Sequence, residues 1–131
     1  MTLFHAVVFI DHSHAQILQF DAEHVQAQKV KASSRHTKQH GGAVRSEHEF
    51  FAHVCDALDG IAEILVTGPK TGLADFRHYV DKHRPQTARR IVGYEVVDHP
   101  SANQLVAHGR RFFARFDRTL EWGAPAFLQY A

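Results

Sequence analysis

The chain has 131 residues, a length typical of a single domain. Hydrophobic residues make up 44% of the sequence and charged residues 22%, a balance that argues against a disordered, collagen-like or coiled-coil protein. The formal net charge is +1, no apolar run is long enough to span a membrane, and the N-terminal residues lack the basic region of a signal peptide. We therefore expect a soluble cytoplasmic protein, and the single cysteine, Cys55, fits a reducing compartment.

The first part of the chain predicts three strands. Short apolar and β-branched runs, separated by polar turns, indicate strands at 5–10, 15–20 and 24–31. The run 5–10 is apolar throughout, which is typical of a central strand covered on both faces, whereas 24–31 alternates with polar residues and should be half exposed. The segment 32–45 has no periodicity and contains two adjacent glycines, so we expect a long loop there.

Helices and strands should alternate in the rest of the chain. Ser46 and Glu49 have the spacing of a capping box, which predicts that a helix begins at Ser46, and Gly60 should end it. Ser101 and Gln104 repeat this spacing before a last helix. Between them we expect a strand at 61–67, a helix at 71–83 that is limited by a proline, and a strand at 91–97, with a short C-terminal tail from 119.

This order, βββαβαβα, predicts one α/β domain over 1–131. An antiparallel meander followed by strand and helix alternation gives a mixed five-stranded sheet with about three helices packed against it. That is the arrangement of a ribonuclease H-like motif.

The segment 29–45 is strongly basic. It contains five lysine and arginine residues and no acidic residue. Such a segment can neutralise phosphates, and its glycines let the backbone approach a polyanion closely. We therefore predict a nucleic-acid contact made by Arg35, Lys38, His40, Gly41, Gly42 and Arg45. The alternative is a solvated basic loop without a ligand, and a second basic patch could come from four arginines of the last helix, Arg110, Arg111, Arg115 and Arg118.

The same segment carries a resemblance to a known family. Residues 38–43, Lys-Gln-His-Gly-Gly-Ala, precede a Phe-rich helix and resemble the Gly-Gly-Gln loop and following helix in the middle domain of eukaryotic and archaeal class 1 release factors and Pelota. The strand, glycine turn, helix and strand within 62–97 are similar to that domain. Residues 98–101, Asp-His-Pro-Ser, resemble a segment of single-domain bacterial relatives, the translational machinery and host attachment proteins.

The resemblance covers roughly 4–116 and implies a bacterial, translation-associated protein that binds the ribosome, tRNA or rRNA. In release factors the glutamine after the two glycines helps to position water for attack on the peptidyl-tRNA ester, and Ala43 stands in its place here. A methyl group neither donates nor accepts a hydrogen bond, so binding is favoured over hydrolysis. A peptidyl-tRNA or other ester hydrolase using Gln39 or His40 is the alternative, and a protein-interaction module is another.

Metal binding is a weaker hypothesis. His12 and His14 have a spacing that places both imidazoles on one side of an extended strand, where they could hold a metal ion, but a polar turn is the favoured explanation, because the spacing fixes no third ligand. A metal-dependent nuclease would instead gather carboxylates from the first strand, a helix and a later strand, as Asp11, Glu49 and Asp98 could do.

Two further expectations concern ligands and assembly. The turn 67–72 joins a strand to a helix and could hold a phosphate, but it lacks the spacing of a Walker loop, and ordinary turn chemistry is favoured. We expect no cofactor, and exposed sheet edges could pair two copies into a homodimer.

Overall fold

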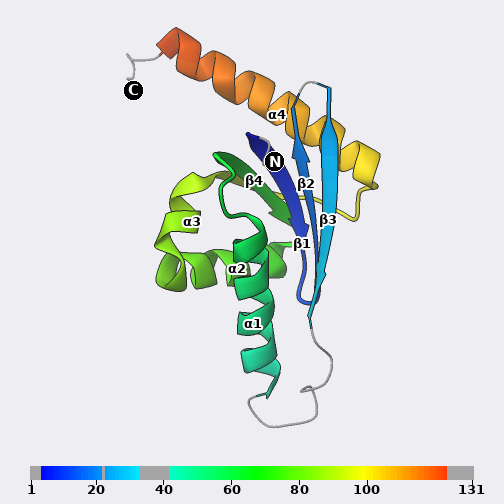
Figure 1. Ribbon diagram of the computed structural model, residues 1–131, viewed down its shortest axis with the longest axis vertical. Coiled ribbons are helices and arrows are strands. Elements are labelled where there is room, and N and C mark those ends of the chain that lie inside the picture. Colours follow the sequence, from blue (N-terminus) through cyan, green and yellow to red (C-terminus); the bar gives the residue numbers. More distant parts are fainter. Residues whose placement is uncertain (1–3, 22, 33–41, 124–131) are drawn as a thin grey trace.

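Figure 1 shows the computed structural model of the protein, which describes residues 4–21, 23–32 and 42–123. Within 42–45 and 117–123 the description covers the backbone alone. Five strands and four helices follow one another in this part of the chain: β1 (His5–Ile10), β2 (His14–Phe20), β3 (Val25–Lys31), α1 (Gly42–Ala57), β4 (Glu63–Gly68), α2 (Lys70–His83), α3 (Pro85–Arg90), β5 (Ile91–Val96) and α4 (Ala102–Gly123).

The strands form one mixed sheet in the order β3-β2-β1-β4-β5. β2 is antiparallel to β1 and β3, whereas β4 is parallel to β1 and β5 is parallel to β4. The central position of β1 confirms the prediction from its apolar run. β3, predicted to be half exposed, lies at an edge of the sheet and is exposed along most of its length. This topology is the ribonuclease H-like motif, so the predicted fold class is confirmed. Because β1, β3, β4 and β5 all run in one direction, their carboxyl ends lie at one edge of the sheet, which we call the carboxyl edge.

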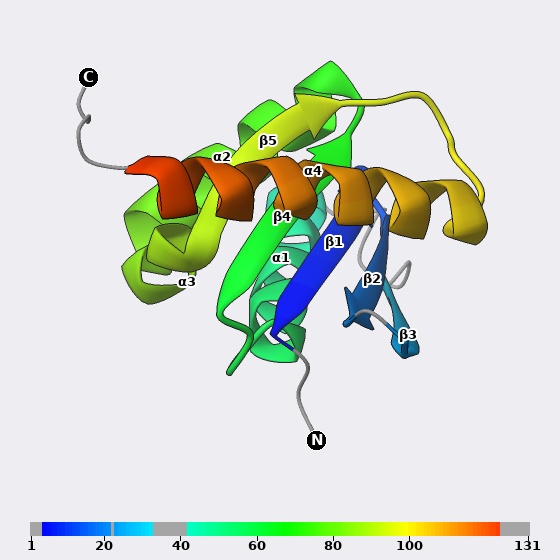
Figure 2. The ribbon, with the colours of Figure 1, turned by 90° about the horizontal axis from the view of Figure 1, so that it is seen from above.

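Helices cover both faces of the sheet. α1, α2 and α3 lie on one face and α4 crosses the other (Figure 2). Successive residues of β1 point to opposite faces, so Ala6 and Val8 pack with α1 and α2, while Val7 packs with α4. Both core clusters are filled by phenylalanine side chains of the helices: Phe50, Phe51 and Phe76 on the first face and Phe113 on the second.

The helix predicted to begin at Ser46 begins four residues earlier, at Gly42. The capping-box prediction is therefore wrong: Ser46 is buried inside the helix, its Oγ has no hydrogen-bond partner among the described residues, and Glu49 is exposed. Alanine and arginine are strong helix formers, so the residues before Ser46 extend the helix back to the glycine pair, where helix propensity falls. Residues 42–45, predicted as the end of a loop over 32–45, are therefore helical.

The short helix α3 was not predicted. Pro85 was expected only to limit the preceding helix, and α2 does end at His83, but Pro85 also occupies the first turn of α3. Proline is favoured there because its fixed φ suits a helix start and its missing N–H has no partner at that position. Between the two helices, Arg84 has the extended φ of −135° expected before a proline.

The last helix confirms its capping box. The Ser101 N–H donates to Gln104 Oε1 at 2.9 Å, and the Gln104 N–H donates to Ser101 Oγ at 3.2 Å. α4 continues to Gly123, so the predicted tail from 119 is helical over its first residues, and 124–131 lie outside the described residues. Among the described helices, none combines the length and the apolar character needed to cross a membrane.

Candidate functional site

In the sequence, the predicted contact segment follows β3, which ends at the carboxyl edge, and leads into α1 (Figure 1). Directly after β3, the Ala32 N–H donates a hydrogen bond of 2.8 Å to the Ser13 carbonyl oxygen, which fixes the end of β3 beside the turn between β1 and β2. Gly42 is the first residue of α1, and Arg45 follows in the same helix, where only its backbone is described. The other predicted residues lie outside the described residues: Arg35, Lys38, Gln39, His40 and Gly41.

Two lysines of the basic segment are described, and both are exposed. Lys29 and Lys31 alternate with the half-buried Val30, so they share one face of β3. This is the face that α4 crosses, because Val25 and Ala27, on the same side of β3, line a groove with residues of α4. Lys29 and Lys31 therefore lie on an open part of the sheet directly before the predicted contact segment.

An aromatic pair continues this surface across the sheet. Lys29 is the register partner of Gln16 on β2, and Gln16 is the register partner of Phe9 on β1, so the three side chains form one row. The ring of His99, from the segment between β5 and α4, lies 5.4 Å from the ring of Phe9. We call Phe9, Gln16, Lys29, Lys31 and His99 the open sheet surface; it combines cationic, amide and aromatic groups.

Two arginines of α4, Arg110 and Arg111, lie farther along the same edge strand. Arg110 and Arg111 line the groove between α4 and β3. The Arg110 guanidinium donates to the Asp21 carbonyl oxygen at 3.0 Å and lies 5.8 Å from the centre of the Phe20 ring. Arg110 thus holds the turn between β2 and β3 in addition to contributing charge. The side chain of Arg118 is outside the described residues.

The structure does not unite the carboxylates of the nuclease hypothesis. Asp11 accepts hydrogen bonds from the Ser13 and His14 N–H groups, at 2.9 and 2.7 Å, and so stabilises the turn after β1. Asp98 accepts from the His99 N–H, which holds the pKa of its carboxyl below the usual value. Among the described residues, one group of three possible metal ligands has its donor atoms within 4.8 Å of one another, and it contains neither of these residues nor Glu49.

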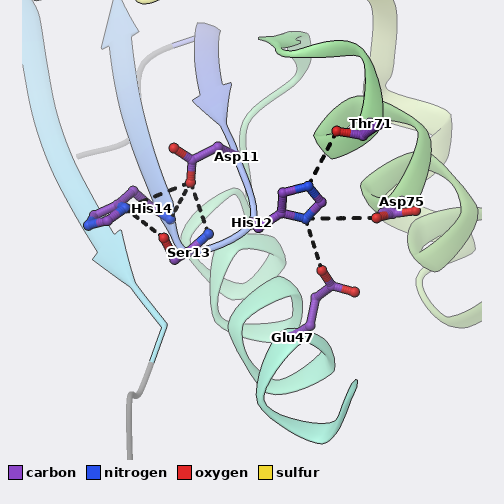
Figure 3. A network of polar contacts seen from close by, with 7 residues as sticks. All are labelled: Asp11, His12, Ser13, His14, Glu47, Thr71 and Asp75. Carbon is purple, nitrogen blue, oxygen red and sulfur yellow. Dashed lines mark hydrogen bonds and ion pairs between the residues drawn. The ribbon is translucent and has the colours of Figure 1, made fainter. Parts of the chain in front are cut away.

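That group is made by His12, Glu47 and Asp75 (Figure 3). His12 Nδ1 lies 3.3 Å from Glu47 Oε2 and 3.8 Å from Asp75 Oδ2, while Nε2 lies 3.3 Å from Thr71 Oγ1. His14 points elsewhere, toward Ser13 and Asp11 (Figure 3). His14 therefore does not join His12, because the Asp11 carboxylate holds this segment in the polar turn that the sequence favoured.

Close packing explains the two glycines of the turn 67–72, which was considered as a phosphate site. Gly68 has a φ of +156°, and a Cβ there would lie 2.1 Å from the Ile10 carbonyl oxygen. A Cβ at Gly72 would lie 3.2 Å from the Cα of Asp11. The Thr67 hydroxyl is buried and donates to the Val8 carbonyl oxygen at 2.7 Å. Close contact between this turn and β1 accounts for both glycines.

Comparisons with known proteins support the fold. No protein-family model matches the sequence, and no curated protein matches it. The solved structure of Pelota from Thermoplasma acidophilum is similar, with a TM-score of 0.60 and 18% identity over 81% of this chain and 31% of that chain. Pelota from Archaeoglobus fulgidus has a TM-score of 0.58 and 18% identity over 92% of this chain and 39% of that chain.

The archaeal translation termination factor aRF1 is also similar, with a TM-score of 0.58 and 12% identity over 87% of this chain and 41% of that chain. The chain thus spans less than half the length of these proteins. At such low identities the similarity establishes the fold alone, and at that level it agrees with the resemblance to release-factor-like proteins found in the sequence.

Proposed function

We propose that this protein binds ribosomal RNA or tRNA on the ribosome through the basic segment 29–45 and the open sheet surface. The observation that carries the proposal is the placement of Lys29 and Lys31, exposed on the sheet and directly followed by a segment with three more cations and no acidic residue. The fold supports a role in translation, because one of the similar structures is that of a translation termination factor.

The open sheet surface suits an RNA chain chemically. Lys29 and Lys31 form no ion pair with any described residue, so their charges are available to phosphates. Phe9 and His99 offer ring faces on which an unpaired base could stack, and Gln16 offers an amide between the rings and Lys29. Phosphate contacts supply affinity, while stacking favours single-stranded segments.

The proposal is for binding without ester hydrolysis. The residue in the place of the release-factor glutamine, Ala43, has no group that could orient water, and its backbone belongs to the first turn of α1. Gly42 is the first residue of this helix.

The test is the salt dependence of binding to tRNA and to ribosomal RNA fragments, measured by fluorescence anisotropy. The logarithm of affinity falls against the logarithm of salt with a slope of about −0.7 per phosphate contacted on a single strand and about −0.9 on a duplex. Five cations would give a slope of about −3.5 to −4.5. Replacing Lys29 and Lys31 by alanine should weaken binding and reduce the slope by about 1.4 to 1.8.

A matched control removes the same charge elsewhere. Lys82 and Arg89 are exposed on α2 and α3, which cover the opposite face of the sheet, so the Lys82→Ala, Arg89→Ala variant should bind like the unaltered protein. Equal losses in the two variants would show that total charge and not this surface governs binding. Turnover of peptidyl-tRNA that disappears in Gln39→Ala or His40→Ala would replace the proposal with the hydrolase alternative.

A further inference from the structure

The cluster of His12, Glu47 and Asp75 has no part in the proposed RNA contact. We propose that these three residues form a binding site for a divalent transition-metal ion, for which zinc is the best match to the donor atoms. The site joins three elements that are distant in sequence: the turn after β1, the second turn of α1 and the second turn of α2 (Figure 3).

The spacing of the donor atoms is close to that of an occupied site. Tetrahedral zinc has bonds of about 2.0–2.1 Å to imidazole nitrogen and carboxylate oxygen, which places its ligand atoms about 3.3–3.4 Å apart. His12 Nδ1 and Glu47 Oε2 are 3.3 Å apart, and Nδ1 and Asp75 Oδ2 are 3.8 Å apart. All three donor atoms lie within 4.8 Å of one another, so small side-chain rotations would bring them to one ion.

The imidazole of His12 is oriented for this role by a second contact. Its Nε2 lies 3.3 Å from the Thr71 hydroxyl, which can accept the Nε2 proton and leave the lone pair of Nδ1 facing the two carboxylates. Histidine ligands of metal ions commonly donate their other ring N–H to such a partner. Thr71 and Asp75 are one turn apart on α2, so this helix supplies both a ligand and the group that orients another ligand.

The two carboxylate charges of the cluster also favour a bound cation. Glu47 and Asp75 both approach one nitrogen of His12, and neither carboxylate forms an ion pair with a lysine or arginine of the described chain. A neutral imidazole has one hydrogen at most on Nδ1, so it cannot donate to both carboxylates at full strength. A metal ion at the centre would be bound by all three groups at once.

The donor set selects among metal ions. One imidazole nitrogen and two carboxylate oxygens suit zinc or manganese, whereas calcium takes six to eight oxygen ligands and magnesium prefers carboxylates and water. The side chains of His12 and Asp75 are 54% and 51% exposed, which leaves access from solvent and room for water at a fourth position.

The experiment uses Zn²⁺ alone as the probe and the full chain as the protein. Competition with a chromophoric chelator gives the number of bound ions and their affinity. Because the sequence contains 12 histidines, the informative quantity is the difference between variants. Glu47→Gln and Asp75→Asn remove a ligand charge while keeping the size of the side chain, and each should weaken one zinc site by at least about 100-fold, since changes to residues that only orient ligands already cost about 10- to 100-fold.

Two controls have matched chemistry. Glu49→Gln lies on the same helix as Glu47, and His14→Gln lies in the same turn as His12, but neither residue belongs to the cluster. Both controls should keep the tight site, and zinc should shift the imidazole nitrogen resonances of His12 more than those of His14. If the unaltered protein and Glu47→Gln bind zinc equally, or if the controls lose as much affinity, the proposal is wrong. Unfolding curves recorded without metal separate these outcomes from loss of folding.

Discussion

A substitution at Gly68 gives the most quantitative test of the close contact between the end of β4 and the end of β1. Replacing Gly68 by alanine places a Cβ at a φ of +156° and 2.1 Å from the Ile10 carbonyl oxygen. Backbone conformations of this kind cost about 1–3 kcal/mol for residues other than glycine. Forcing an extra carbon into a packed site costs about another 1–3 kcal/mol, because the contacted atom belongs to the backbone of a central strand and cannot rotate away.

The two contributions add to about 2–6 kcal/mol, a large part of the roughly 5–15 kcal/mol that stabilises a typical domain. For a chain of this size we expect each kcal/mol to lower the melting temperature by roughly 3–5 °C, so Gly68→Ala should lower it by about 6 °C at least. Circular dichroism during heating and urea titration provide the two measurements.

Gly60→Ala is the matched control. Gly60 also has a positive φ, +85°, but it is exposed beyond the end of α1. Its replacement should cost about 1–2 kcal/mol, from backbone strain alone. If Gly68→Ala destabilises the protein no more than Gly60→Ala, the clash of the new Cβ with the Ile10 carbonyl oxygen does not cost the free energy estimated for it.

Three further predictions concern single side chains. Ser101→Ala removes the acceptor for the Gln104 N–H and should lower the free energy of unfolding by about 1 kcal/mol in urea titration; no change would show that the cap is dispensable. Ser46→Ala should raise the free energy of unfolding by about 0.5 kcal/mol or more in the same assay, because the Ser46 hydroxyl is buried without a hydrogen-bond partner among the described residues and alanine favours a helix; a loss would indicate a hydrogen bond to Oγ. Burial raises the pKa of the Cys55 thiol to about 11, so about one thiol in a thousand is ionised at pH 8, and alkylation should be slow until denaturant is added. Alkylation of the folded protein at the rate of an exposed cysteine would contradict this.

The two capping boxes show where sequence patterns suffice and where they do not. Ser101 follows a proline, which disfavours helical continuation before it, so its spacing with Gln104 marks a true helix start. Ser46 has the same spacing with Glu49, but good helix formers precede it and the helix runs through. The decisive information therefore lies in the residues before the motif.

The central strand could be predicted because a strand that is buried on both faces has a nearly continuous apolar sequence. The apolar run of β1 indicated its central position, whereas the polar alternation of β3 indicated partial exposure but not that this strand lies at an edge. The meander and the alternation that follows it predicted a mixed sheet, whereas the order β3-β2-β1-β4-β5 comes from the structure.

The polar cluster could be predicted only in part. His12 was recognised as a possible ligand, but its partners Glu47 and Asp75 are 35 and 63 residues away along the chain and have no local spacing that marks them. Only the topology brings the turn after β1 next to the second turns of α1 and α2. The local spacing offered His14 as the partner of His12 only as an alternative to a polar turn, and the Asp11 carboxylate does hold the segment in such a turn.

The central claim, that the basic segment 29–45 binds the translation machinery, is tested most directly by co-sedimentation with ribosomes across a salt series. The unaltered protein is compared with the Arg35→Ala, Lys38→Ala, Arg45→Ala variant and with the Lys82→Ala, Arg89→Ala control. The account predicts that binding weakens steeply with salt and is lost in the segment variant but not in the control. Failure of the unaltered protein to sediment with ribosomes at low salt, or equal binding by the segment variant, would contradict it.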